Sequence, residues 1–450
     1  MMPSLFPRTM SGAIFIQSAK GGRFGTRNKI LYIFGSIFHR NLMSFRYVSS
    51  APPFYLMAKP IGSVCNLNCK YCYYLEKEKL YPNDPQKWFM SERVLESFIA
   101  QYIYSSHEPA VLFTWHGGEP IMRGMEFFEK ALAFQRKYAG GKTIGNSLQT
   151  NGTTLTDDWC KFFHDNRFLI GLSIDGPEHC HDHYRLYKSG QPSFARVMNG
   201  LELLKKYSVE FNTLSVVNDY NAQYPLEVYR FLKSIGSHYM QFIPIVEWID
   251  PNASSGELSI LPANSKKHAE VTDWSVDPDD YGNFLIKIFD EWVRKDVGDY
   301  FVITFDCVLA NWMRVPPPIC VYAETCGHAG VVEYNGDVYS CDHYVFPEYK
   351  LGNIKEKTLL TYMHSEIQRQ FGRNKRDTLP GYCKKCEFLD LCTGECPKNR
   401  LTNTPDGEPG LNYLCAGFKK FYKHVEPYFE FMANELQHGR AASNVKHFRP

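Results

Sequence analysis

Long hydrophobic runs are absent from this sequence. The longest candidate, residues 30–38, is too short to span a bilayer and is interrupted by Gly35 and Ser36. An excess of charge of either sign is also lacking, because 50 Lys and Arg residues stand against 48 Asp and Glu, for a net charge of +2. We therefore expect no membrane span and no general affinity for nucleic acid or for a membrane surface.

Acidic residues are missing from the first 50 positions, which hold seven Lys and Arg residues and no Asp or Glu. A transit peptide has this composition, but the segment lacks a convincing apolar core and a small-residue cleavage site. We favour the interpretation that these residues precede the true start, because Met43 lies just ahead of the first predicted strand. In either case, residues 1–50 are expected to form a poorly ordered basic leader.

Cysteine, in contrast, is abundant, with 14 residues in 450. Eleven of the 14 fall in spacings typical of metal ligands. In a reducing compartment such spacings indicate metal binding rather than disulfides. We therefore expect a cytoplasmic metalloprotein.

The first cysteine group is Cys65-x3-Cys69-x2-Cys72, just after a short apolar run at 54–61. Three thiolates leave one iron of a [4Fe–4S] cube without a protein ligand, so that a small molecule can bind at that corner. A zinc site is the alternative, but it needs a fourth Cys or His at a matching spacing, and the next candidate, His107, is far away. We therefore favour an open iron–sulfur cluster.

From residue 54, short β-rich runs alternate with longer segments of helical periodicity. This alternation predicts a parallel, barrel-like sheet with its function at the carboxyl ends of the strands. Ser91 is expected to begin a helix and Gly236 to end one. The predicted strands are 55–60, 111–115, 144–149, 168–174, 210–217 and 239–243, and the predicted helices are 91–105, 124–138, 156–165, 194–207, 223–235 and 279–295.

Residues able to bind a ligand follow several of these strands. After the second strand, Gly117 and Gly118 permit close backbone approach, and Glu119 offers a carboxylate at the rim. Ser173 ends the fourth strand and is suited to hydrogen-bond a ribose, while Arg185 is suited to pair with a carboxylate. From the residues alone, the glycines and Glu119 predict only a tight turn with an exposed acid.

Three alternate histidines, His179, His181 and His183, also suggest a metal site. Nothing nearby in the sequence completes a ligand shell around them. We therefore expect a solvated loop here.

From residue 320 the remaining cysteines become regularly spaced, and eight of them are enough for two four-thiolate clusters. Zinc is the main competitor, because Cys383-x2-Cys386 resembles half of a zinc ribbon. Spacing alone does not say which cysteines share a metal. The pattern runs Cys320-x5-Cys326-x14-Cys341, then Cys383-x2-Cys386-x5-Cys392-x3-Cys396, and then Cys415, while Cys160, Cys180 and Cys307 fit no spacing.

The first cysteine group, with Tyr71 before its last cysteine, resembles the radical S-adenosylmethionine (radical SAM) signature C-x3-C-x2-C. The later cysteines resemble the twin-cluster SPASM domain of radical SAM enzymes that modify peptides. Among these, the chain resembles the anaerobic sulfatase-maturating enzymes from about residue 55 to 435. The resemblance includes Leu-Gln-Thr-Asn-Gly (148–152), Gly-Leu-Ser-Ile-Asp-Gly-Pro (171–177), Cys-Asp-His-Tyr-Val (341–345), Leu-Gly-Asn-Ile (351–354) and Leu-Asn-Tyr-Leu-Cys (411–415).

The resemblance implies an α/β fold, with a partial (β/α)6 radical SAM barrel at 51–300 and a SPASM domain with a C-terminal helix at 301–450. It implies three [4Fe–4S] clusters, held by Cys65, Cys69 and Cys72, by Cys320, Cys326, Cys341 and Cys396, and by Cys383, Cys386, Cys392 and Cys415. It also implies that S-adenosyl-L-methionine contacts Tyr71, Gly117, Gly118, Glu119, Ser173, Arg185 and the backbone around Met240.

The activity that the resemblance implies is oxidation of a Cys or Ser side chain to Cα-formylglycine in newly made sulfatases. The cofactor supplies a radical that removes a Cβ hydrogen, Asp342 takes the thiol or hydroxyl proton, and an auxiliary cluster accepts the second electron. Tyr74 is expected to position the peptide. The implied partners are an unfolded polypeptide with a Cys/Ser-x-Pro-x-Arg motif and a low-potential electron donor.

Two alternatives remain open on the residues alone. The same machinery performs other peptide modifications, such as thioether or carbon–carbon crosslinking, which need no base at position 342. The chain is also compatible with a metal-bound regulator or scaffold that does no chemistry. Without the resemblance, Asp342 is equally well explained as a loop cap and Tyr74 as a core aromatic.

Overall fold

The computed structural model describes residues 53–81, 88–254, 257–263, 265 and 269–450, so the expected leader at 1–50 lies outside the described residues. Six strands pair in parallel and in chain order, and each prediction is confirmed to within one residue at each end. They are β1 (Tyr55–Lys59), β2 (Ala110–Trp115), β3 (Thr143–Thr150), β4 (Leu169–Ser173), β5 (Phe211–Val217) and β6 (Tyr239–Pro244).

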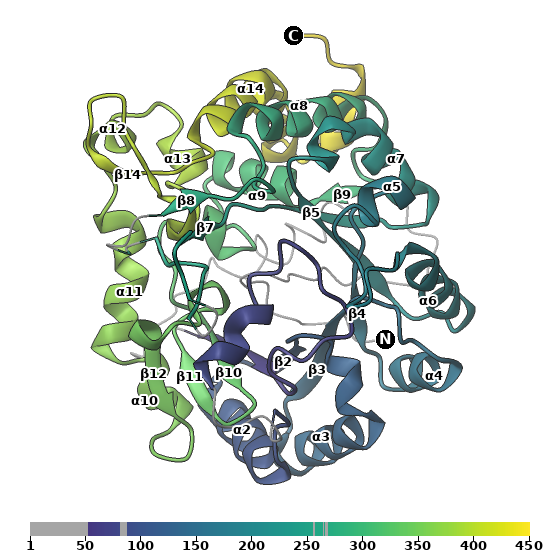
Figure 1. Ribbon diagram of the computed structural model, residues 1–450. Helices are drawn as coiled ribbons and strands as arrows, with labels where there is room; N and C mark the ends of the chain where they lie inside the picture. The colour runs from purple at the N-terminus through teal and green to yellow at the C-terminus, as the bar shows by residue number, and fades with distance from the viewer. Residues whose placement is uncertain (1–52, 82–87, 255–256, 264, 266–268) are drawn as a thin grey trace.

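The predicted helices are also confirmed, to within two residues, and in Figure 1 they lie along the outside of the curved sheet. The Ser91 hydroxyl accepts a hydrogen bond from the Val94 backbone N–H at the start of the first, and Gly236 follows the end of α7 in a left-handed conformation. The helices are α2 (Glu92–Ser105), α3 (Met125–Tyr138), α4 (Asp157–Asp165), α6 (Phe194–Lys206), α7 (Pro225–Ser234) and α8 (Pro278–Lys295).

Alternation along the strands separates the two faces of the sheet. Val111, Phe113 and Trp115 of β2 are buried against the helices, in a cluster with Phe98 of α2. Thr114 points the other way and hydrogen-bonds to a serine of β3. The barrel therefore has an apolar outer layer and a partly polar interior.

The sheet continues beyond the six predicted strands. At one edge, β10 (Ala329–Glu333) pairs in parallel with the whole of β1, and β11 (Asp337–Tyr339) and β12 (Lys350–Asn353) follow as antiparallel strands. At the other edge, β9 (Phe301–Val302) pairs with β6. The last third of the chain thus joins the barrel sheet at both edges, and Asp342 is brought within reach of Lys59, the last residue of β1.

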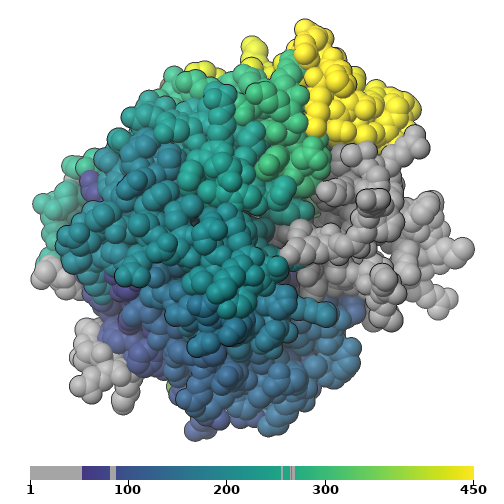
Figure 2. Space-filling model, turned by 90° about the vertical axis from the view of Figure 1, so that its right-hand side faces the viewer, coloured from purple at the N-terminus to yellow at the C-terminus, as the bar shows by residue number. Residues whose placement is uncertain are grey.

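The C-terminal helix α14 (Cys415–Gln437) packs on α8. Among the described residues, no helix is both long and apolar enough to cross a membrane. Figure 2 shows the outer face of the barrel as a continuous surface from blue to green, with the yellow C-terminal segment against its upper edge.

A glycine contact lets α14 approach α8 closely. A Cβ on Gly417 would lie 1.9 Å from the Pro278 carbonyl oxygen, and Gly417 also faces Gly282. We expect Gly417→Ala to destabilise the fold by about 2 kcal/mol, because the helices must move apart. The urea unfolding midpoint measures this loss. Ala416→Ser, on the exposed side of the same turn, is the control, and equal midpoints for the two variants would contradict the prediction.

Candidate active site at the carboxyl end of the barrel

The first three cysteines lie on the loop between β1 and the short helix η1 (Leu75–Leu80). All three are free thiols. Burial raises the pKa of Cys65 and of Cys69 to about 12, so these groups need a cationic partner to become thiolates at neutral pH. The irons of a cluster supply that charge, and the thiols fit such a group. Among the described residues, no three His, Cys, Asp or Glu side chains are arranged to hold a single metal ion.

The loop after β2 packs directly against the loop that leads to Cys65. The Gly118 N–H donates to the Gly62 carbonyl at 2.8 Å, and the Glu119 N–H donates to the Val64 carbonyl at 2.9 Å. A Cβ on Gly118 would lie 2.0 Å from the Val64 carbonyl oxygen. Gly118 is therefore required for this contact between the two loops, whatever it does for a cofactor.

The Glu119 carboxylate is buried rather than exposed. It accepts hydrogen bonds from the Thr150 hydroxyl and the Asn151 N–H, both at 2.8 Å, and from the Ile121 N–H at 3.2 Å. Burial raises the pKa of Glu119 to about 7, although these donors lower it again in part. The side chain thus ties the end of β2 to the end of β3.

Arg185 pairs with a carboxylate of this chain that sequence reasoning missed. Its Nε and Nη2 atoms lie 2.9 and 3.2 Å from the two oxygens of Asp175, and the Tyr71 hydroxyl donates to the same carboxylate. Ser173 accepts a hydrogen bond from the Gln149 amide at 2.8 Å. The sequence signal was present in the acid that directly follows the fourth strand.

The barrel interior retains polar atoms without partners. The side-chain oxygens of Gln149 on β3 and Gln241 on β6 are buried and have no hydrogen-bond partner among the described residues. Met240, next to Gln241, packs its side chain into the outer core, so that only its backbone is available to the interior. An interior with unsatisfied acceptors fits a bound polar cofactor.

The solvated-loop prediction for the three histidines is wrong for one of them. His181 is fully buried and its Nε2 lies 3.0 Å from the Ser193 hydroxyl. His179 pairs with Glu227, and His183 stacks on Tyr220 at a centroid distance of 3.9 Å. Each of the three rings therefore has side-chain partners within the protein.

Asp342 lies in a buried polar group at the carboxyl end of β1. Its Oδ1 is 2.7 Å from the Lys59 ammonium, and its Oδ2 accepts a hydrogen bond from the Tyr73 hydroxyl at 2.5 Å. The Lys59 Nζ also lies 3.0 Å from His116 Nδ1, which the Gly117 N–H approaches at 2.8 Å. One carboxylate oxygen thus lies in an ion pair with Lys59 and the other in a hydrogen bond with Tyr73.

The electrostatics of this group fix its protonation. Burial acts to raise the pKa of Asp342, but the Lys59 ammonium outweighs it and holds the pKa below its usual range. Burial and the same ammonium lower the pKa of His116 to about 3. Since His116 Nδ1 faces two donors, the neutral ring carries its proton on Nε2. At neutral pH the site therefore combines a carboxylate, an ammonium and a neutral imidazole.

Tyr74 lies beneath this group rather than beside the carboxylate. Its hydroxyl donates to Glu333, with both carboxylate oxygens at 2.7 Å, and its ring lies 4.1 Å from the Lys59 ammonium. The tyrosine that reaches Asp342 is Tyr73. Sequence reasoning missed Lys59, and its only signal was a lysine at the end of an apolar strand.

The eight later cysteines gather in two groups that interleave along the chain. Burial raises the pKa of Cys341, and the other three thiols of its group raise it further. The pKa of Cys415 is raised in the same way by burial and then by Cys383 and Cys386. The groups coincide with the two sets that the resemblance implies: Cys320, Cys326, Cys341 and Cys396 in one, and Cys383, Cys386, Cys392 and Cys415 in the other.

A buried lysine caps the first of these groups. The Lys375 ammonium, fully buried, donates to the carbonyl oxygens of Cys320 and Val321, each at 2.7 Å, and to that of Ala323. It lies close enough for the thiols of Cys320 and Cys326 to act on its pKa, which burial lowers. The site therefore places a positive charge beside the thiolates that a cluster needs.

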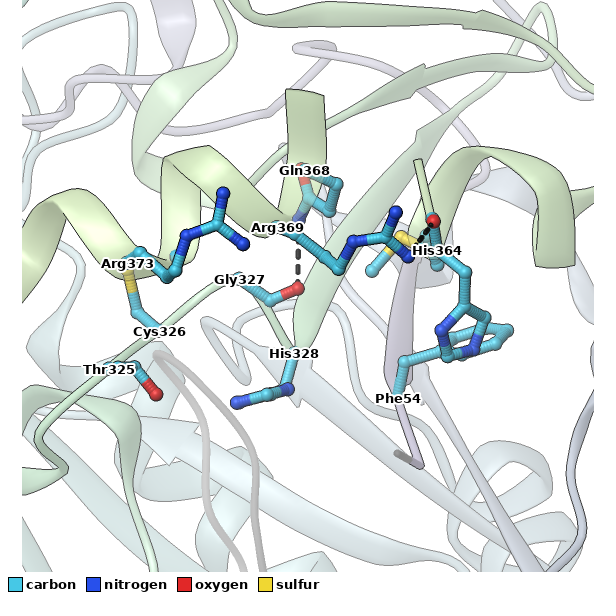
Figure 3. Close-up of a pocket in the computed structure, with 11 residues that line it drawn as sticks. Phe54, Thr325, Cys326, Gly327, His328, His364, Gln368, Arg369 and Arg373 are labelled. Atoms are coloured by element: carbon cyan, nitrogen blue, oxygen red, sulfur yellow. Dashed lines mark hydrogen bonds between the residues drawn. The ribbon is translucent and has the colours of Figure 1, made fainter. Parts of the chain in front are cut away.

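A cavity of about 180 Å³ is lined by Cys326, Arg369 and Arg373, and Figure 3 shows the Arg369 side chain reaching the His364 carbonyl. Phe54 and His328, which line it, precede β1 and β10, so this cavity lies at the amino ends of these two strands. Both arginines pair with Glu366. The cavity is therefore separate from the candidate active site.

Comparisons with known proteins agree with this architecture. A family model described as the radical SAM superfamily matches residues 60–232, and one described as an iron–sulfur cluster-binding domain (SPASM) matches residues 324–387. The serine-type anaerobic sulfatase-maturating enzyme of Bacteroides thetaiotaomicron is 55% identical over 89% of this chain and 96% of its own. The cysteine-type enzyme of Clostridium perfringens is 34% identical over 86% and 100%.

A solved structure, titled native anSMEcpe with bound AdoMet and Cp18Cys peptide, superposes with a TM-score of 0.74. It is 34% identical and covers 86% of this chain and 100% of its own. The fold class expected from the sequence, a radical SAM barrel followed by a SPASM domain, is confirmed by these matches. The chain belongs to the radical SAM superfamily and, within it, to the anaerobic sulfatase-maturating enzymes.

Proposed function

We propose that this enzyme oxidises a Cys or Ser side chain of a sulfatase polypeptide to Cα-formylglycine. The observation that carries the proposal is the buried group of Lys59, Asp342 and Tyr73. Asp342 directly follows Cys341, and Lys59 is the last residue of β1. A carboxylate kept ionised at this place is suited to accept a proton from a substrate side chain. The two types of relative, serine and cysteine, support both target residues.

The proposed cofactors are three [4Fe–4S] clusters and S-adenosyl-L-methionine. When bound, they supply the radical that takes the Cβ hydrogen atom and the acceptor for the second electron. Cys65, Cys69 and Cys72 hold the first cluster, and the two groups of four later cysteines hold the others. The unpaired oxygens of Gln149 and Gln241 and the rim at Glu119 support S-adenosyl-L-methionine in the barrel interior.

In this proposal the protein's own residues accept the proton and hold the reacting groups in position. Asp342 accepts the proton from the substrate hydroxyl or thiol, while Lys59 and Tyr73 hold both carboxylate oxygens in place. Removal of one hydrogen atom, one proton and one electron leaves an aldehyde from Ser, or a thioaldehyde from Cys that water converts to the aldehyde. The target side chain must reach Asp342, which is 4% exposed, so we propose an unfolded substrate segment.

The proposed partners are an unfolded sulfatase polypeptide with a Cys/Ser-x-Pro-x-Arg motif and a low-potential electron donor. The solved relative has a bound peptide. We also propose a cytoplasmic location. All 14 cysteines are free thiols, and unpaired thiols persist in reducing compartments.

The test is anaerobic incubation of the reconstituted enzyme, S-adenosylmethionine and dithionite with peptides that carry Cys or Ser in the motif. We expect a peptide aldehyde that a hydrazide reagent traps, together with 5′-deoxyadenosine. Loss of two hydrogens from the Cys peptide without a trappable aldehyde would favour crosslinking. Absence of 5′-deoxyadenosine would favour a scaffold without chemistry.

A further inference from the structure

A second cavity lies next to the Asp342 group, on the side of helix η1. Its walls include Tyr73 and Lys77 from the first cysteine loop and η1, and His343 and Phe346 from the segment after Cys341. Residues 260–263 form its outer wall. Tyr73 is shared, because its hydroxyl donates to Asp342 from the same wall. Tyr73 therefore links this cavity to the Asp342 group.

Lys77 is the unusual side chain here. It is only 2% exposed, and its ammonium has no hydrogen-bond acceptor among the described residues. The ammonium lies over the face of the Phe346 ring, at 3.4 Å from the centroid. The neighbouring Lys398 is already satisfied by Glu247 and the Val246 carbonyl, at 2.7 and 2.6 Å. Three buried N–H donors without an acceptor are costly, so an acceptor supplied by a ligand is the simplest explanation for their retention.

The charges around Lys77 indicate what kind of acceptor fits. Burial lowers the pKa of Lys77 to about 8, while Glu76, Glu247 and Glu333 raise it in part, so the group is mainly charged at neutral pH. Glu76 is paired with Lys79 and Glu247 with Lys398, and burial raises the pKa of Glu333 to about 7. A neutral oxygen is therefore the better fit, because burying it here costs less desolvation free energy than burying an anion.

We propose that the Lys77 ammonium donates to a backbone carbonyl oxygen of the substrate peptide, on a residue close to the oxidised side chain. Every peptide presents such a carbonyl whatever its side chains, and the cavity, about 10 Å³, has room for one oxygen atom beside the ammonium. The inference rests on the proposed function, because it takes the substrate to be a peptide. Lys77 is thus a substrate-positioning residue.

The first experiment measures peptide binding directly. We use the anaerobically reconstituted holoenzyme with S-adenosylmethionine and a fluorescein-labelled Cys-x-Pro-x-Arg peptide, and we read anisotropy. Lys77→Met keeps the side-chain length and removes the donors. We expect it to raise the peptide Kd and KM about tenfold, equal to about 1.4 kcal/mol, with kcat within twofold of the unchanged enzyme.

The matched control is Lys79→Met on the same helix. Lys79 is already partnered by Glu76 and the Glu257 carbonyl, so its loss removes the same charge without freeing the cavity. We expect its peptide Kd to stay within twofold of the unchanged enzyme. A Kd for Lys77→Met that is equally unchanged would overturn the proposal.

A second measurement identifies the carbonyl and does not depend on one variant. Peptides in which a single C=O is replaced by C=S, a weaker acceptor, are compared on the unchanged enzyme and on Lys77→Met. We expect the C=S replacement at one position to weaken peptide binding to the unchanged enzyme but not to Lys77→Met. Equal losses of peptide affinity for both proteins at every position would contradict the inference.

The two proposals fail in distinguishable ways. If the peptide binds through Lys77 but no aldehyde forms, the substrate contact stands and the proposed oxidation is wrong. If aldehyde forms and Lys77→Met binds the peptide as well as the unchanged enzyme, only the Lys77 contact is wrong.

Discussion

Replacing Asp342 by asparagine is expected to abolish aldehyde formation while 5′-deoxyadenosine continues to appear. The amide cannot accept the proton of the substrate hydroxyl or thiol, and general-base removal of this kind is worth roughly 10²- to 10⁴-fold in rate. The effect lies at the upper end of this range, because the change also leaves the buried Lys59 ammonium, 2.7 Å from Oδ1, without its counter-charge. Aldehyde and 5′-deoxyadenosine are measured in the same anaerobic samples.

A matched control separates the chemistry from the loss of a buried carboxylate. Asp337 on β11 is also buried and pairs with Lys350 at 2.8 Å, but it lies outside the Asp342 group. We expect Asp337→Asn to retain the ratio of aldehyde to 5′-deoxyadenosine of the unchanged enzyme. Iron content reports whether either variant still assembles. Aldehyde formation by Asp342→Asn at the original rate would remove Asp342 from the mechanism.

The parts of the fold that were predictable are those with local signals. Each of the six strands is a short β-rich run flanked by periodic helices, and the pattern alone located it. The pairing of β10 with β1 joins Tyr55 to Ala329 and has no local signal, because β10 looks like any other short strand. That pairing carries Asp342 to Lys59. The sequence therefore contained both residues but not their contact.

The residues of the site also divide into those that have a sequence signal and those that do not. Cysteine spacing revealed how many thiols are available, but Cys396 joins Cys320 in space across 75 intervening positions, and only the resemblance assigned it there. Tyr73 and Lys77 are single polar residues, which in a sequence are indistinguishable from solvated ones. Only the structure shows that Lys77 is buried, at 2% exposure.

Changing Cys65, Cys69 and Cys72 together to alanine is expected to remove all 5′-deoxyadenosine and all aldehyde. These three thiols are the proposed ligands of the cluster with an open iron, and the later cysteines form two separate complete sets of four. Anaerobic iron and sulfide analysis should therefore fall from about twelve irons per chain to about eight, from three cubes of four.

The control for this variant is Cys160→Ala, which removes a buried thiol of α4 that belongs to none of the cysteine groups. We expect it to keep about twelve irons and full cofactor cleavage. The auxiliary clusters should survive in the triple variant, because their ligands lie on the segments after α9 (Ile303–Trp312) and Lys375 still caps the first of them. An iron content unchanged by the triple substitution, or zinc in its place, would show that these cysteines hold no iron–sulfur cluster and leave the radical without a source.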